Sequence, residues 1–202
     1  MSEHDSASSM PYNTQKLEHI LEAILFAANK VMSIDALYNL LQEDISPSRP
    51  EIKVALISLM ANYQNKGINL VELAGGYRFQ TKKEYSVWVS RLWDEKPQKY
   101  SRAMLETLSL IAYRQPITRG DIEEVRGVVV SSTIMKTLQE RNWIKVIGYR
   151  DVPGRPSMYA TTKQFLDYFN LKSLEELPSL AEIRDIETIS KDFSDQLNLI
   201  DS

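Results

Sequence analysis

The sequence predicts an α+β fold, mainly helical, in which one arrangement of elements occurs twice. Three segments with the apolar spacing of amphipathic helices are followed by two short strands that flank a turn, first within residues 14–92 and again within 101–178. A charged stretch that contains a proline, residues 93–100, has the composition of a linker between the two copies. Three helices and a β-hairpin in this order form a winged helix. We therefore expect tandem winged-helix domains, followed by an amphipathic C-terminal tail.

The first copy follows a polar lead, residues 1–13, that we expect to be disordered. Asn29 can end its first helix, and Ser33 is placed to cap the second. Ser48, with Glu51 three residues later, has the spacing of a capping box for the third helix. The expected elements are helices over residues 16–28, 34–41, 49–66 and 84–92, and strands over 68–73 and 77–81.

The second copy begins at Ser101, a candidate N-cap. Thr118 can cap its second helix and Gly127 can close it, while Asn142 stands where a left-handed residue often ends a third helix. The expected elements are helices over residues 101–114, 118–127, 131–141 and 162–170, and strands over 143–147 and 158–161.

Composition places the chain among ordinary globular proteins of the cytoplasm. Of its 202 residues, 43% are hydrophobic, which is ample for two packed cores. It has no cysteine, so disulfides, thiol catalysis and cysteine-bound zinc are excluded. The longest apolar run near the start, 24–28, is far shorter than the roughly 20 residues that cross a bilayer. The polar lead also differs from a signal peptide, so we expect no membrane association.

Charge argues against strong autonomous DNA binding. The chain has a net charge of -3 and a pI near 5.5. Proteins that bind nucleic acid mainly through its phosphates usually have an excess of basic residues and a higher pI. Residues 101–178 hold eleven Lys and Arg against nine Asp and Glu, whereas 179–202 hold two against six.

The acidic tail, residues 179–202, carries the pattern of an amphipathic helix. Ser179 and Glu182 can form a capping box, and apolar residues then recur every three or four positions. Two interpretations stay open: the tail docks weakly on its own protein or frays, or it lies in a partner's groove or supports self-association. The apolar residues are Leu180, Ile183, Ile186, Ile189, Phe193, Leu197 and Ile200.

No catalytic, metal or cofactor site can be assembled from the sequence. The two histidines, His4 and His19, have no nearby ligand pair. Glu123 and Glu124 are adjacent, so they point to different sides of a helix and do not form a carboxylate pair. The glycines at 75–76 lack the frame of a phosphate loop. We predict a protein that is not an enzyme.

Two features of the second copy are candidates for binding. Its third helix, SSTIMKTLQER, lies where a DNA-reading helix would lie, but its only long cations are Lys136 and Arg141. The loop RDVPGRPS places Arg150 and Arg155 beside a rigid frame of prolines and glycine. Such a wing can meet a phosphate backbone or an acidic protein surface.

The first helix predicts self-association. Its apolar surface is broader than one face of a small domain needs, and such an excess commonly marks a subunit interface. The predicted dimer contacts are Leu17, Leu21, Ile24 and Leu25.

Several stretches between about Leu17 and Pro178 resemble the ScpB family, the segregation and condensation protein B of bacteria and archaea. The resemblance is carried by LSLIAYRQPITRGDIEEVRG, DVPGRPSMYATTKQF and LKSLEELP, with LEAILFAA in the first helix and GGYRFQT in the first hairpin. Asn142 and Trp143 depart from the more usual Gly-Leu, and Val128 to Ser132 is an individual version of a variable stretch. The tail lies outside the resemblance.

The resemblance implies a non-enzymatic accessory subunit of the SMC condensin-like complex, located in the cytoplasm with the nucleoid. It implies a homodimer that pairs through the N-terminal winged helices, binds the kleisin ScpA and reaches the SMC ATPase through it, with DNA contacted weakly or indirectly. The outcome would be chromosome condensation and segregation at cell division. The alternative is a winged-helix transcription regulator that binds DNA. Five residues are predicted either to contact the partner or to shape the loop that makes this contact: Arg150, Gly154, Arg155, Pro156 and Tyr159.

Overall fold

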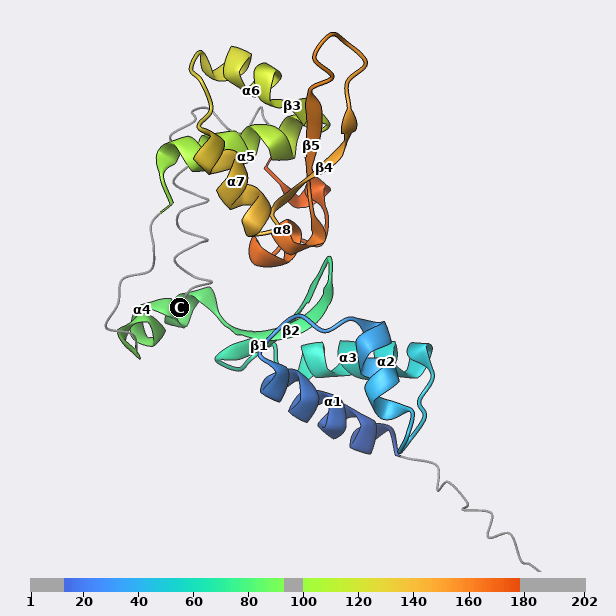
Figure 1. The fold of residues 1–202 in the computed structure, drawn as a ribbon. Coiled ribbons are helices and arrows are strands. Elements are labelled where there is room, and N and C mark those ends of the chain that lie inside the picture. Colours follow the sequence, from blue (N-terminus) through green and yellow to red (C-terminus); the bar gives the residue numbers. More distant parts are fainter. Residues whose placement is uncertain (1–12, 93–99, 179–202) are drawn as a thin grey trace, which may run out of the picture. The chain divides into compact units, whose positions relative to one another are not determined.

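The computed structural model describes residues 13–92 and 100–178, which form two compact units (Figure 1). The first unit runs to Glu72 and includes Gly76–Lys82, and the second takes Leu73–Gly75 and the chain from Lys83 onward. The expected lead at 1–13, linker at 93–100 and tail at 179–202 lie outside the described residues, except for Asn13 and Tyr100.

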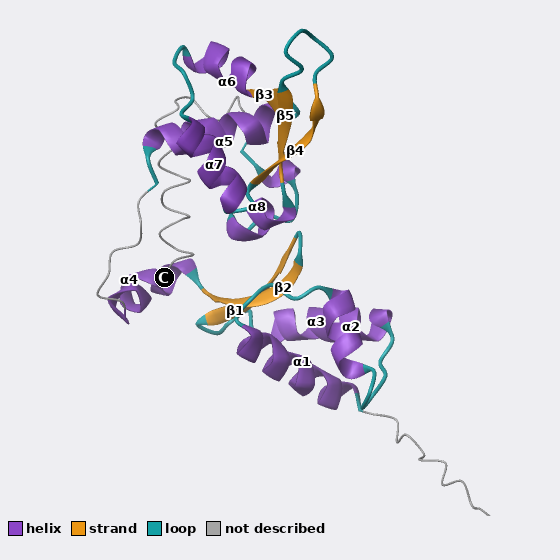
Figure 2. Ribbon diagram, in the orientation of Figure 1, coloured by secondary structure: helices purple, strands orange, loops and turns teal. Residues whose placement is uncertain are grey.

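The first unit has the three helices and the hairpin of a winged helix (Figures 1 and 2). Each predicted cap is confirmed: Asn29 adopts a left-handed φ of 44°, Ser33 accepts a hydrogen bond from the Ala36 N–H, and Ser48 with Glu51 forms a capping box. The elements are α1 (Thr14–Ala28), α2 (Ile34–Leu41), α3 (Arg49–Asn62), β1 (Ile68–Leu73) and β2 (Gly76–Thr81).

Helix α3 ends at Asn62, so the expected extension to residue 66 is wrong. The cause is Tyr63, whose side chain turns into the core and leaves 9% of its surface exposed. Its ring centroid lies 4.8 Å from that of Phe79, and its hydroxyl donates to Glu22 on α1. These contacts lie far away in the sequence, so helical periodicity alone does not reveal the stop.

The expected helix at 84–92 is also broken. The structure has a 3₁₀ turn at Lys83–Tyr85, a one-turn helix α4 (Ser86–Val89) and a second 3₁₀ turn at Ser90–Leu92. No side chain caps α4, and its residues are β-branched, aromatic or Ser, which are weak helix formers. The side chains of Val87, Trp88 and Leu92 in this segment are exposed, so they do not pack against either core.

The second unit repeats the order and adds a closing helix (Figure 2). Thr118 and Asp121 form a capping box, and Gly127 and Asn142 adopt positive φ angles of 68° and 55° at the helix ends, as predicted. The elements are α5 (Arg102–Arg114), β3 (Ile117–Thr118), α6 (Arg119–Arg126), α7 (Ser132–Glu140), β4 (Ile144–Tyr149), β5 (Ser157–Thr161) and α8 (Lys163–Tyr168).

The sheet of the second unit has three strands in the order β3-β5-β4, rather than the two that the sequence predicts. The additional strand is only two residues long, and Ile117 pairs with Tyr159. In the first unit a single bridge between Met32 and Tyr77 stands at the corresponding place before α2. Both units are therefore winged helices, and the predicted fold class is confirmed.

The two cores differ in composition. The first is mainly aliphatic and is built from Leu and Ile of the three helices. The second contains a cluster in which the Trp143 ring centroid lies 4.6–5.4 Å from those of its aromatic neighbours. Phe165 is fully buried beside this cluster. The neighbours of Trp143 are Tyr100, Tyr168 and Phe169.

Candidate protein-interaction surfaces

The hairpin β4–β5 forms the wing of the second unit. An ion pair between Arg150, which follows β4, and Asp121 on α6 connects the wing to the helices. Both terminal nitrogens of Arg150 donate to the carboxylate of Asp121, at 2.8 and 2.7 Å. Asp121 also accepts from the backbone of Thr118 in the capping box of α6. The hydrogen bonds from Arg150, and then that from Thr118, lower the pKa of Asp121 to about 2. Arg150 therefore holds the wing against α6.

The tip of the wing is a compact turn. The Arg150 N–H donates to the Pro156 carbonyl, and the Arg155 N–H donates to the Val152 carbonyl. Gly154 and Arg155 adopt left-handed φ angles of 85° and 37°. Residues 151–155 are exposed, and the Arg155 guanidinium forms no ion pair with any residue that the structure describes.

The remaining predicted contact residues shape the hairpin. Pro156 is half-buried at the end of the turn. Tyr159 is half-buried on the central strand, where it pairs with both neighbouring strands and packs against the core. The five predicted partner contacts are thus together on one wing, but only Gly154 and Arg155 lie at its exposed tip.

A row of apolar side chains flanks this tip. The expected strand residues Val146 and Ile147 are exposed because a bulge between Val146 and Gly148 breaks the alternation of β4. Tyr149 and Val152 continue the exposed apolar surface. The tip thus places apolar side chains beside the exposed Arg155 cation, a mixture that suits a protein surface better than a phosphate backbone.

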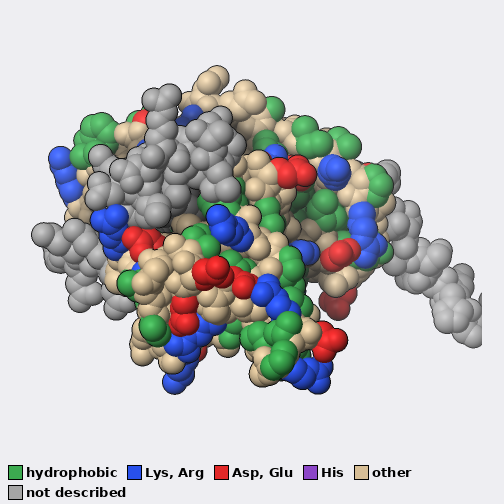
Figure 3. All heavy atoms as spheres, turned by 90° about the horizontal axis from the view of Figure 1, so that it is seen from above, with side chains coloured by type: hydrophobic (Ala, Val, Ile, Leu, Met, Phe, Trp, Pro, Cys, Tyr) green, Lys and Arg blue, Asp and Glu red, His purple; other side chains and the backbone are tan. Residues whose placement is uncertain are grey.

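Helix α7 does not present its cations as a DNA-reading helix would. Arg141 donates from Nη1 to the Tyr100 hydroxyl at 2.6 Å, and its guanidinium lies 4.7 Å from the Tyr100 ring centroid. Lys136 lies 3.6 Å from Glu140 in a surface ion pair. Basic and acidic side chains are interspersed over the face of the molecule in Figure 3, without a field of one sign. Of the two long cations expected to read DNA, only Lys136 is exposed, because Arg141 is held by Tyr100.

Burial contradicts three of the four dimer contacts predicted on α1. Leu17, Leu21 and Leu25 expose 1%, 0% and 1% of their surface, because they form the first core together with residues of α3 and β2. Only Ile24 is half-buried, and it packs at the edge of that core. These leucines complete the unit itself and are not available to a second copy.

Other apolar side chains of the first unit are exposed instead. Phe26 on α1 exposes 71% of its surface, and Val54 and Ile57 on α3 expose 61% and 55%. The two α3 residues were not predicted from the sequence, although it contains a signal for them. Helix α3 is apolar around most of its circumference, more than one core-facing stripe requires.

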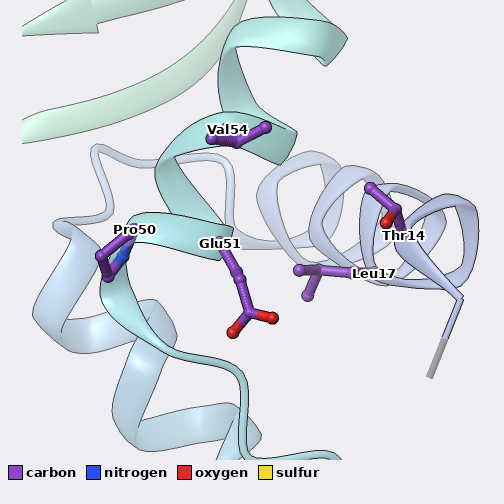
Figure 4. A pocket seen from close by; sticks show the side chains of 5 residues that line it. All are labelled: Thr14, Leu17, Pro50, Glu51 and Val54. Carbon is purple, nitrogen blue, oxygen red and sulfur yellow. The ribbon is translucent and has the colours of Figure 1, made fainter. Parts of the chain in front are cut away.

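A shallow pocket lies beside this α3 face (Figure 4). Its volume of about 240 Å³ is below the roughly 300–1,000 Å³ of small-molecule sites. It suits one apolar side chain of a partner better than a cofactor. The lining residues come from the start of α1 and the first turns of α3: Thr14, Leu17, Pro50, Glu51 and Val54.

Within residues 13–92 and 100–178, no group of three or more His, Asp or Glu is placed to hold a metal ion. No helix in this described part of the chain is long and apolar enough to cross a membrane.

A family model described as the segregation and condensation complex subunit ScpB matches residues 19–180. The chain belongs to the ScpB family. This family match covers both winged helices except for the first residues of α1, and it leaves residues 181–202 outside.

Curated relatives agree with this family assignment. A "Segregation and condensation protein B homolog" of Coxiella burnetii is 53% identical over 181 residues, which are 90% of this chain and 87% of that protein. The "Segregation and condensation protein B" of Syntrophotalea carbinolica is 40% identical over 174 residues, 86% of this chain and 87% of that protein. Among solved structures, ScpB from Mycobacterium tuberculosis is 31% identical, covers 78% of this chain and 96% of its own, and gives a TM-score of 0.37.

Proposed function

We propose that this member of the ScpB family is a non-enzymatic scaffold subunit of an SMC complex. In this proposal the first unit forms a homodimer, and the second unit binds the kleisin ScpA, which connects it to the SMC ATPase. The chain thereby supports chromosome condensation and segregation at the nucleoid, with DNA contacted weakly or indirectly and without a cofactor.

The proposal rests mainly on which side chains are exposed on the third helix of each unit, α3 and α7. Helix α3 exposes apolar side chains at Val54 and Ile57, and α7 has its Arg141 cation held by Tyr100. A winged helix that reads DNA needs free polar and cationic groups on this helix. Exposed apolar surface instead favours a protein partner, in agreement with the family name.

The transcription-regulator alternative has less support. It requires Lys136 and Arg141 to reach base edges or phosphates, but the structure holds Arg141 against Tyr100 and leaves only Lys136 of the two exposed. The net charge of -3 argues in the same direction.

The test is reconstitution with ScpA from the same cell. We expect a complex with two copies of this chain per ScpA at moderate salt, seen by mass measurement of the eluted species. Arg155→Glu should weaken ScpA binding by at least tenfold, about 1.4 kcal/mol, while the dimer remains. Charge reversal at Lys145, an exposed cation on β4 outside the tip, is the matched control and should bind normally.

Two results would contradict the proposal. If no ScpA is retained while the chain binds one DNA sequence with strong salt dependence, the regulator alternative is correct. If Arg155→Glu and Lys145→Glu weaken ScpA binding equally, the effect comes from net charge and the tip is not the contact.

A further inference from the structure

Most side chains of helix α5 are buried within its own unit, but those on one narrow side of the helix are only half-buried. The half-buried side chains between its ends are Ala103, Glu106, Leu110 and Tyr113, at spacings of three, four and three residues. This spacing places them on one side of the helix, and we call them the α5 strip. Ser109, which is adjacent to this side, has a buried hydroxyl with no hydrogen-bond partner among the described residues. A central helix with one uncovered strip lacks a covering element.

The described chain ends on this strip. The Tyr113 hydroxyl donates to the Pro178 carbonyl at 2.9 Å, and Leu177 packs against the core of the same unit. The described chain therefore ends beside one end of the strip. A helical segment of 24 residues would be about 36 Å long, whereas the 13 residues of α5 span about 20 Å, so the tail is long enough to follow the strip to its other end.

At that other end the strip meets an exposed apolar surface. Glu106 forms an ion pair with Arg126, the last residue of α6, at 2.9 Å. Around the end of α6 lie three exposed valines, Val125, Val128 and Val129, which we call the valine patch.

The loop that carries the valine patch is held in a fixed position. Glu123 accepts from the Val130 N–H, and Arg119 donates to the Val130 carbonyl while it is paired with Glu123. The exposed valines are therefore presented by an ordered loop, which lowers the entropy that binding has to overcome.

We propose that the tail, residues 179–202, docks along the α5 strip of its own unit and reaches the valine patch. Its apolar residues at three- and four-residue spacing match the valine patch and three members of the strip, Ala103, Leu110 and Tyr113. Its charge is complementary: it carries six acidic residues against two basic ones, and the exposed Arg114 beside Tyr113 forms no ion pair with a described residue. The proposal needs no partner protein, so it stands or falls independently of ScpA binding.

The absence of cysteine from the chain makes a cysteine cross-link a clean test. The full-length variant Leu110→Cys with Ile183→Cys places one thiol on the strip and one on the apolar side of the tail, five residues after Pro178. Leu110→Cys with Asp185→Cys is the matched control, because Asp185 lies on the opposite side of the same helical turn. With a short bis-maleimide we expect the first pair to cross-link within one chain at several-fold higher yield than the second.

The yield and the size of the product decide the outcome. Equal yields for the two pairs would overturn the proposal. A product of two chains, confirmed by mixing the Leu110→Cys and Ile183→Cys single variants, would show that a second copy occupies the strip instead. Val129→Asp in the first pair should reduce the intramolecular product, because it places a charge in the valine patch.

Hydrogen exchange of the unsubstituted chain avoids any effect of Leu110→Cys on packing. We expect slowed exchange of the backbone amides of residues 180–200, and loss of this protection in Phe193→Asp. Exchange of these amides at the rate of an unstructured peptide in the original chain would also overturn the proposal.

Discussion

The two wings have the same topology but are attached to their units in different ways. In the first unit, Met32 and Tyr77 exchange two backbone hydrogen bonds of 2.9 Å each, which tie β2 to the segment before α2. In the second unit the strand pairing between β3 and β5 is supplemented by side chains, namely the Arg150–Asp121 ion pair and the aromatic cluster around Trp143.

This difference shows what each attachment requires. The backbone attachment brings two main chains so close that a side chain at Gly76 has no room. The side-chain attachment places no such steric limit on the tip of the second wing. The position of this wing depends instead on the Asp121 carboxylate and the Trp143 indole. Three comparisons of variants test this contrast.

The largest effect is expected at the aromatic cluster. Trp143 exposes 2% of its surface, so Trp143→Ala should lower the free energy of unfolding of the second unit by about 3–5 kcal/mol, through lost burial and the cavity left behind. Urea unfolding followed by far-UV circular dichroism measures this loss. Trp88→Ala removes the same side chain from an exposed site and should change stability by about 0.5 kcal/mol or less. Similar losses in both variants would mean that the cluster does not stabilise the second unit.

The two wing glycines should respond unequally to substitution. A Cβ at Gly76 would lie 2.1 Å from the Met32 carbonyl oxygen, at a φ of 140°, so Gly76→Ala must displace the backbone. At Gly154, which has a φ of 85°, no atom lies within 4 Å of an added Cβ. Gly154→Ala should therefore lose about 1 kcal/mol of stability, from the strained φ alone. We expect Gly76→Ala to cost about twice that or more, measured by thermal unfolding. Equal costs would contradict the close backbone approach in the first wing.

The smallest effect is the pH dependence of the second wing. The pKa of Asp121 is lowered to about 2, against about 3.9 for an unfolded chain, so the ionised form is favoured in the folded state. The resulting stability is complete above the unfolded pKa and is lost as the pH falls from about 4 to about 2. Wild type and Asp121→Asn should therefore differ in unfolding free energy at pH 7 and converge near pH 2, measured by urea titrations at each pH.

The effect is small because Arg150 and Asp121 are both partly exposed, which weakens their ion pair. The control is Arg150→Met, in which Asp121→Asn should no longer change the pH dependence to the same extent. A difference between wild type and Asp121→Asn that stays constant from pH 7 to pH 2 would exclude the ion pair as its cause.

Much of the fold was predictable because its signals are local. The caps at Ser33, Ser48 and Thr118 each involve a hydrogen bond to a residue three positions away, and Gly127 and Asn142 act through their own φ angles. All the residues that form such a cap lie within a few positions of one another, so the sequence alone reveals it. Two of the errors concern elements that depend on distant contacts: α3 stops where Tyr63 meets Phe79, and β4 bulges where it pairs with β5. The break in the expected helix at 84–92 has a local cause, the weak helix formers of α4.

The candidate surfaces were predicted less completely for the same reason. The sequence pointed to the loop at 150–156, but not to the bond that ties Arg150 to a carboxylate 29 residues earlier. It also assigned the α1 leucines to a subunit interface, although α3 and β2 cover them. The apolar pattern of α3 contained the signal for an exposed apolar face, yet periodicity cannot decide which of its faces meets the core.

The sequence by itself determined the order of the elements, most of their ends, the doubled winged helix and the resemblance to the ScpB family. Only the tertiary structure decided which groups remain available to a partner: it buries Leu17, Leu21 and Leu25, holds Arg141 and Arg150 within their unit, and leaves Val54, Ile57 and Arg155 exposed. Caps and turns depend on neighbouring residues, whereas exposure depends on which distant segments cover each face.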